Sequence, residues 1–138
     1  MSVWAYGSSP AAQDAVGVVR QVYDAFDRHD LESVLPLLAP DVVIDVEATA
    51  RLAGREGPYV GHDGARQYAE DADRVWDELE LSADDVRSAG HSVVIFGGVR
   101  GVLGGHEIVR RVVWTWRLRD GLVTSVSVSD ITGDASAI

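Results

Sequence analysis

Apolar residues recur at helical spacing in three segments of the first half of the chain. The first segment follows Ser9 and Pro10, a pair typical of a helix start, and carries Val16, Val19, Val22, Tyr23 and Phe26. Asp30 is the expected cap of a second, shorter helix that ends before Pro40. Asp63 is the expected cap of a third helix, whose apolar stripe comprises Ala65, Tyr68, Ala69, Ala72, Val75 and Trp76.

Alternation of polar and apolar residues predicts strands in most of the remaining chain. The period changes from helical to alternating at Asp41, after which Val42, Ile44, Val46 and Ala48 share one face. Four further strands are predicted over residues 78–88, 91–103, 106–118 and 122–131. The segment from Thr49 to Gly61 contains three glycines and a proline, which predicts an irregular loop that could serve as a lid.

This order of elements predicts an α+β fold in which three helices pack on one face of a curved antiparallel sheet. The chain has 138 residues, and folding at that length removes roughly 70% of the unfolded chain's surface from water. We therefore expect a single domain over residues 1–138, with a core at about 11–131 and short tails at both ends.

The turn at Arg119–Gly121 decides how the last two strands face each other. A two-residue Asp-Gly turn would set tryptophans opposite serines, whereas a three-residue loop pairs Trp114 with Val126. We therefore predict the three-residue loop. This register places Arg110 directly opposite Asp130, unless a bulge shifts it.

Two glycines are predicted on the buried face of the preceding hairpin. A two-residue turn at Gly104–Gly105 pairs Val99 with Arg110, and the same register turns Gly97 and Gly101 inward. A glycine inside a strand marks either a bend or room for a ligand, and the sequence leaves both interpretations open.

Charge and composition exclude several classes of function. The formal net charge of −10 opposes binding to nucleic acid and to anionic membrane surfaces, and no apolar run approaches the ~20 residues of a membrane span. All basic residues are arginines, so Schiff-base chemistry on lysine is excluded, and the absence of cysteine removes thiolate chemistry. The first residues show no secretory signal, which favours a cytoplasmic protein.

Metal sites and hydrolase triads find no support in the sequence. The four histidines, His29, His62, His91 and His106, fall at predicted turns or helix ends, without the spacing of metal ligands on a helix. The alternating serines of the last strand have no histidine beside them. We expect neither a metal nor a cofactor.

Three segments together resemble a known superfamily. They are VVRQVYDAFDRHDLESVLPLLAPDVVIDVEA, GHDGARQY and WTWRLRDGLVTSVSVSD, and their order and spacing are similar to the SnoaL-like and ketosteroid-isomerase-like branch of the nuclear transport factor 2-like superfamily. The resemblance covers residues 11–131. It implies a cone-shaped α+β fold, an apolar cavity between helices and sheet, and a homodimer built on the outer sheet face. Members include isomerases, epoxide hydrolases, polyketide cyclases and proteins with no known reaction.

The catalytic positions of the isomerases do not carry over to this chain. The resemblance places their proton-shuttling Asp at Val46, their oxyanion-hole Tyr at Val22 and their second acid at Trp114. These replacements argue against steroid isomerisation, unless a slip of one residue brings Asp45 and Tyr23 inward.

The epoxide hydrolase pattern is also absent. Arg100 is not followed by the expected Asp two residues later, and Val128 stands where the last-strand Asp of those enzymes would be. Asp130 lies two residues further along the same strand face.

The candidate site residues each have two interpretations. Asp130 is a candidate general base and Arg110 a candidate binder of a substrate oxygen, whereas the alternative is a structural salt bridge between them. Asp45 is a further catalytic candidate, although its strand face favours solvent or a dimer contact. The candidate ligand-binding residues are Tyr23, Tyr59, Tyr68, Val99, Trp114 and Trp116.

The sequence thus predicts a cofactor-free enzyme that isomerises, cyclises or hydrolyses an apolar or aromatic metabolite. The alternatives are a binding protein with the same pocket and no turnover, and a dimeric accessory protein. Only the enzyme predicts that Asp130→Asn abolishes turnover while leaving binding nearly intact.

Overall fold

The computed structural model describes residues 10–131 of the chain. Its helices are α1 (Pro10–Asp27), α2 (Leu31–Val34), α3 (Glu47–Leu52) and α4 (Gly61–Val75), and one turn of 3-10 helix spans Leu35–Leu37. Its strands are β1 (Leu38–Asp45), β2 (Tyr59–Val60), β3 (Glu78–Ala89), β4 (Ser92–Leu103), β5 (His106–Arg119) and β6 (Leu122–Asp130). Within the described part, no helix is both long enough and apolar enough to span a membrane.

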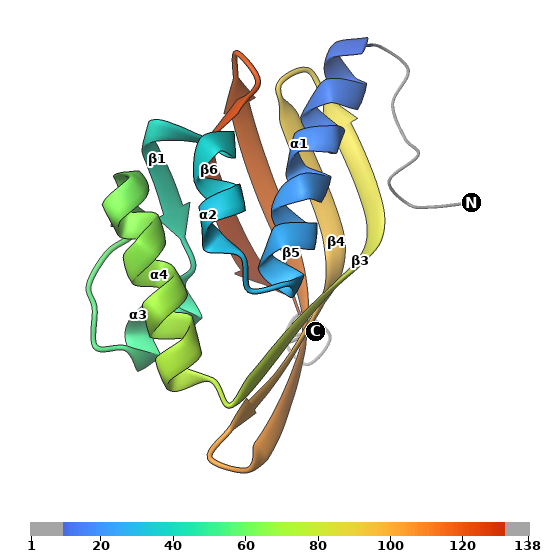
Figure 1. Ribbon diagram of the computed structural model, residues 1–138. Coiled ribbons are helices and arrows are strands. Elements are labelled where there is room, and N and C mark those ends of the chain that lie inside the picture. Colours follow the sequence, from blue (N-terminus) through green and yellow to red (C-terminus); the bar gives the residue numbers. More distant parts are fainter. Residues whose placement is uncertain (1–9, 132–138) are drawn as a thin grey trace.

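The strands form one six-stranded sheet in the order β2-β1-β6-β5-β4-β3. All neighbours are antiparallel except β1 and β6, which run parallel. The helices lie together on one face of this twisted sheet, as Figure 1 shows. The predicted α+β fold is therefore confirmed, with the difference that the sheet is mixed rather than purely antiparallel.

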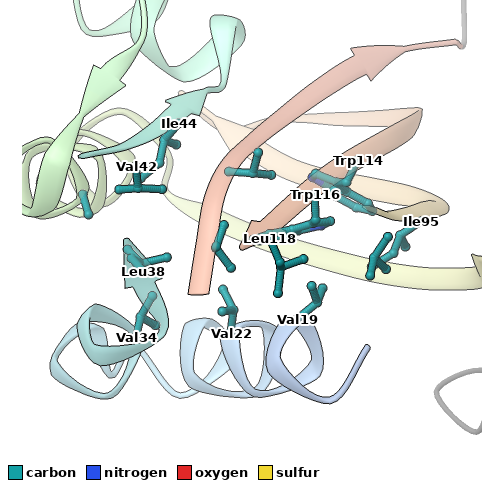
Figure 2. Packing of buried hydrophobic residues seen from close by; sticks show 14 of the residues in the cluster. Val19, Val22, Val34, Leu38, Val42, Ile44, Ile95, Trp114, Trp116 and Leu118 are labelled. Carbon is teal, nitrogen blue, oxygen red and sulfur yellow. The ribbon is translucent and has the colours of Figure 1, made fainter. Parts of the chain in front are cut away.

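The core lies between α1 and the inner face of the sheet. Val19 and Val22 of α1 point toward Trp116 and Leu118 of β5 (Figure 2). Val19 is completely buried, as is Val42 of β1. Burying each side chain of this size contributes about 1.5–3 kcal/mol to folding, so this layer contact fixes how the helices sit over the sheet.

The first two predicted helices begin where the sequence placed them. The residue Asp30 caps α2 by accepting a hydrogen bond from the Ser33 amide at 3.3 Å, as predicted. The helix then tightens into the 3-10 turn that contains Pro36, because proline lacks the amide needed to continue an α-helix.

The segment between β1 and α4 differs from the sequence prediction. Instead of an irregular loop from Thr49, residues Glu47–Leu52 form α3, whose outer side carries an ion pair of 3.7 Å between Arg51 and Glu47. Helix α4 starts at Gly61, and Val60 rather than Asp63 occupies the cap position. Asp63 instead pairs with Arg66 at 2.9 Å within the first turn.

The β5–β6 hairpin corrects the predicted register. Asp120 and Gly121 form a two-residue turn, with φ of 53° and 78°, so the three-residue loop is wrong. A bulge next to Leu118 then shifts the pairing by one residue. Beyond the bulge each inner-face tryptophan of β5 faces a valine of β6. The predicted pairing of tryptophan with valine is therefore present, but a two-residue turn and a bulge produce it instead of a three-residue loop.

Candidate functional site

Three aromatic side chains form a wall on the inner face of the sheet. The ring of Tyr23, from α1, stands edge-on to Trp114 with centroids 5.5 Å apart, and its centroid lies 5.6 Å from that of Trp116. Burial raises the pKa of Tyr23 well above its ordinary value. The Tyr23 phenol is therefore neutral at physiological pH.

A second aromatic group lies where α4 meets α1. The ring of Tyr68 stacks on Phe26, with centroids 6.4 Å apart, and meets Tyr59 edge-on at 5.5 Å. Burial raises the pKa of Tyr68 well above its ordinary value. Thr49 is 2% exposed and accepts a hydrogen bond of 3.1 Å from the indole nitrogen of Trp76.

The two inner-face glycines make room for neighbours within the chain. A Cβ atom on Gly101 would lie 2.6 Å from a ring carbon of Trp76, so the indole covers this glycine. A Cβ atom on Gly97 would lie 1.9 Å from the carbonyl oxygen of Ser82, next to the bulge in β3. The space at Gly101 is thus filled by Trp76, and Gly97 permits a close approach of two strands.

Arg110 and Asp130 form an ion pair, but not across directly opposed positions. Asp130 faces Val112, and Arg110 reaches it diagonally, with its Nε 3.4 Å from the carboxylate Oδ2. The two side chains are 53% and 51% exposed. The predicted contact is therefore present, the predicted register is wrong, and both charges are accessible to solvent.

Of the remaining candidate residues, Val99 lies beside the Arg110–Asp130 pair and Asp45 lies apart from it. Val99 lies opposite Arg110 on β4 and packs against the core from the same face. Asp45 is exposed at the end of β1, opposite Ser127, and does not join this group. Asp45 and Tyr23 are the two residues that a slip of one position was predicted to turn inward, and only Tyr23 faces the interior.

A buried carboxylate that the sequence analysis did not single out lies on α4. Asp71 has only 1% of its side chain exposed and pairs with Arg55 through both carboxylate oxygens. It also accepts hydrogen bonds from Tyr59 at 2.7 Å, Gln67 at 2.9 Å and Arg74 at 3.3 Å. These donors, Arg55 first, hold the pKa of Asp71 well below its usual range.

This network fixes Tyr59 inside the protein. Tyr59 is 4% exposed and pairs with Ile44 of β1, while its hydroxyl donates to the Asp71 carboxylate. Burial and this bond raise the pKa of Tyr59 to about 12. Tyr59 thus anchors the connection between α3 and α4 rather than lying in an open lid.

One sequence signal could have revealed Asp71. It lies three residues after Tyr68 and four after Gln67, so it falls on the inward side of a helix whose other inward residues are mostly apolar. A charged residue on such a side needs partners if it is buried. Within residues 10–131 there is no group of histidine and carboxylate side chains that could hold a metal ion.

Comparisons with known proteins agree with this architecture. A family model for SnoaL-like domains matches residues 19–126. An NTF2-like protein of unknown function from Burkholderia pseudomallei is 26% identical, with a TM-score of 0.78 over 90% of this chain and 95% of that one. No curated protein matches the chain.

Two further solved structures share the fold at lower identity. TerC, co-crystallized with polyporic acid, is 24% identical, with a TM-score of 0.77 over 90% of this chain and 96% of its own. An LEH-like epoxide hydrolase of M. tuberculosis is 18% identical, with a TM-score of 0.71 over 88% of this chain and 85% of its own. One architecture therefore serves proteins of different activities.

Proposed function

The chain belongs to the family of SnoaL-like domains, and on that premise we propose that it binds a small apolar or aromatic molecule against the inner sheet face and transforms it by cofactor-free acid–base chemistry. The reaction class is an isomerisation, a cyclisation or a hydrolysis. The observation that supports this proposal is the Arg110–Asp130 pair, which sets two accessible charges at the edge of an aromatic wall.

The register of the sheet supports a single binding position. Trp114 faces Val128, and the next pair along the same face is Val112 with Asp130. Trp114 itself is only 4% exposed, so a flat apolar molecule would lie against the half-buried Val128 beside it and direct its polar end to the ion pair. Each Å² of apolar surface that it buries contributes about 25 cal/mol to binding, so the wall would supply affinity and the charges would supply orientation.

The two charged residues have complementary chemical roles. The carboxylate of Asp130 accepts a proton from a C–H or O–H group of the substrate or, in a hydrolysis, from the water molecule that attacks it, which leaves negative charge on a nearby substrate oxygen. The guanidinium of Arg110, 3.4 Å from that carboxylate, binds this oxygen with charge-assisted hydrogen bonds. Asp130 then returns the proton at the new position or to the leaving group.

Relatives of the same fold support a small organic ligand. TerC was co-crystallized with polyporic acid, which is a small organic acid, and an epoxide hydrolase shares the architecture. Arg110 offers the positive charge that an acidic or enolate-like molecule needs in a chain that is otherwise strongly acidic.

A binding protein without turnover is the second candidate function. It is favoured because the resemblance places the catalytic groups of ketosteroid isomerases at Val22, Val46 and Trp114 of this chain, none of which can transfer a proton. Both functions require saturable binding of a small molecule. They differ in whether the bound molecule changes.

The first experiment looks for the ligand and then measures its binding. Native mass spectrometry of freshly purified protein, followed by denaturation, would release a molecule carried from the cell. Polyporic acid is the first probe to titrate, because the related TerC was co-crystallized with it. The readout is the fluorescence of the four tryptophans, which include Trp114 and Trp116 of the inner face. We expect saturable quenching that weakens in Arg110→Gln and not in the control Arg87→Gln, whose arginine pairs with Asp85 elsewhere.

The catalytic step is tested with the substitution Asp130→Asn. Incubation of the released molecule with wild-type protein should yield a product of altered mass or retention time, and Asp130→Asn should abolish this conversion while leaving binding within about twofold. Asp120→Asn is the matched control, because asparagine tolerates the positive φ of that turn. Saturable binding without any conversion by the wild type would favour the binding protein.

We also propose that the protein is a homodimer built on the outer sheet face. The helices cover only the inner face (Figure 1), and the outer face carries Phe96, Val94 and Val113, which are half-buried within one chain. Light scattering after size exclusion should give twice the 14.8 kDa mass of the chain. A monomeric mass at micromolar concentration would contradict this proposal.

A further inference from the structure

The inner face of β4 has a tryptophan contact on each side of Val99. Gly97 and Gly101 are the neighbours of Val99 on this face, because residues two apart in a strand point to the same side. A Cβ atom on Gly97 would lie 3.0 Å from a ring carbon of Trp114, and one on Gly101 would lie 2.6 Å from a ring carbon of Trp76. Val99 therefore lies between two tryptophan contacts.

Both tryptophans are held by side chains of the helical layer. The indole nitrogen of Trp76, which directly follows α4, donates to Oγ1 of Thr49 in α3 at 3.1 Å. The benzene ring of the same indole reaches Gly101, so Trp76 bridges α3 and the sheet. Trp114 is met edge-on by Tyr23 of α1, with centroids 5.5 Å apart. The two contacts meet β4 about 13 Å apart, since four strand residues span that length.

The surface between the two contacts is apolar and adjoins the charge of Arg110. Val99 lies directly opposite Arg110 of β5 and, on its other side, opposite Leu81 of β3. Val99 and Leu81 pack against the core, yet both are only half-buried, as is Trp76. This surface can therefore accept an apolar group beside the guanidinium.

Val99 and the apolar contact of the proposed binding position lie on different sides of the ion pair. That contact is Val128, which precedes Asp130 by two residues on the same face of β6. Val99 lies on the other side, on β4 next to Arg110. A molecule whose polar group is bound by the ion pair would thus have apolar protein surface on two sides of that group.

We propose that the binding position extends across Val99 to Trp76, and that Trp76 selects substrates with a second apolar group beyond the oxygen that Arg110 binds. The inference rests on the proposed function and narrows its ligand class to acids, enols or ketones that carry apolar groups on both sides of the polar centre. Thr49 is a positioning residue, because its hydroxyl holds the indole that covers Gly101.

The test compares phenylacetate with diphenylacetate, which carries a second ring on the carbon next to the carboxylate. Burial of one further ring should make diphenylacetate bind the wild type about tenfold more tightly in isothermal titration calorimetry. Trp76→Ala removes one wall of the contact and should reduce this ratio to about threefold or less. Arg110→Gln should weaken both acids by the same factor and leave the ratio unchanged.

The role of Thr49 is tested by two substitutions of this residue. Thr49→Ser keeps the hydroxyl that accepts from Trp76 and should keep the ratio, whereas Thr49→Val removes the acceptor and should reduce it. Thr115→Val, which removes a hydroxyl from the outer face, is the control and should leave the ratio unchanged. An unchanged ratio in Thr49→Val would contradict the positioning role.

A second measurement uses the wild type alone and stays informative if Trp76→Ala does not fold. Nuclear Overhauser effects should connect the ring protons of bound diphenylacetate with the indole protons of Trp76 and the methyl groups of Val99. Their absence from the saturated complex, or equal affinities of the wild type for the two acids, would overturn the inference and leave the proposed function standing. Binding of neither acid would overturn the proposed binding position as well.

Discussion

Asp71 and Asp130 are both aspartates held by arginine, and they lie in regions of opposite character. Asp71 is 1% exposed and is surrounded by four donor side chains from α4 and from the segment that precedes it. Asp130 is 51% exposed at the end of β6, where its ion pair with Arg110 faces solvent. The first carboxylate is closed to any substrate, while the second is open to one.

The difference shows that a buried ion pair is not evidence of an active site. The strong lowering of the Asp71 pKa would mark it as a candidate if perturbed pKa values alone were used to find sites. Its donors account for that shift and leave no approach for a ligand. The accessible pair beside the aromatic wall is the better candidate, because reactivity requires contact as well as charge.

The substitution Asp71→Asn should have the largest effect on stability. It removes the charge that Arg55 and Arg74 share and weakens the anchoring of Tyr59. We expect a loss of about 2–3 kcal/mol in the free energy of unfolding, measured by urea denaturation. Asp130→Asn is the control and should change it by less than about 0.5 kcal/mol. Equal losses of unfolding free energy in Asp71→Asn and Asp130→Asn would contradict the contrast between the two regions.

The contribution of Asp71 to the free energy of unfolding should decrease at acidic pH. Its folded pKa is below the unfolded value of about 3.9, so its contribution is complete above that value and is lost as the pH falls toward the folded pKa. The stability difference between wild type and Asp71→Asn should therefore be constant from pH 7 to about 5 and shrink below about pH 4. Urea denaturation at a series of pH values measures it, and a difference that grows on acidification would contradict this assignment.

The substitution Tyr59→Phe should have an intermediate effect. It keeps the ring against Tyr68 and removes only the hydroxyl that donates to Asp71. The expected loss is about 1 kcal/mol, because Asp71 keeps its other donors. Thermal unfolding measures this loss, and a double-mutant cycle with Asp71→Asn should show that the two effects are not additive.

The substitution Arg110→Gln should have the smallest effect on stability. Both members of its ion pair are half exposed, so we expect a change below about 0.5 kcal/mol, together with weaker binding of polyporic acid. Urea denaturation and fluorescence titration of the same sample compare the two consequences. A large loss of stability without a loss of binding would make this pair structural.

The sequence predicted the elements with strong periodicity and missed those fixed by distant contacts. The bounds of β4 and β5 were predicted within a residue, because long alternating runs define strands well. Helix α3 was missed since its six residues carry too short a pattern to separate from the preceding strand. Asp71 was missed because its main partner, Arg55, lies sixteen residues earlier in a segment read as a loop.

The candidate pair was predicted for a reason that was only partly correct. The requirement that the apolar faces of β5 and β6 match correctly predicted that Arg110 and Asp130 lie close together. It could not distinguish one longer turn from a short turn followed by a bulge, because both leave tryptophan facing valine. The choice depends on the turn geometry of Asp120 and Gly121, which adopt the left-handed conformations of a two-residue turn.

The bulge beside Leu118 bears on how this hairpin could change during evolution. Thr124 is the extra residue, and its hydroxyl donates to the Arg117 carbonyl at 3.1 Å. Loss of Thr124 together with gain of one turn residue would keep the chain length and leave Asp130 beside Arg110. The number of residues between the turn and the carboxylate would then differ, while the partner of the carboxylate on β5 would stay the same. Carboxylates at this strand end in homologues are therefore better aligned by their β5 partner, which is Val112 for Asp130, than by their distance from the turn.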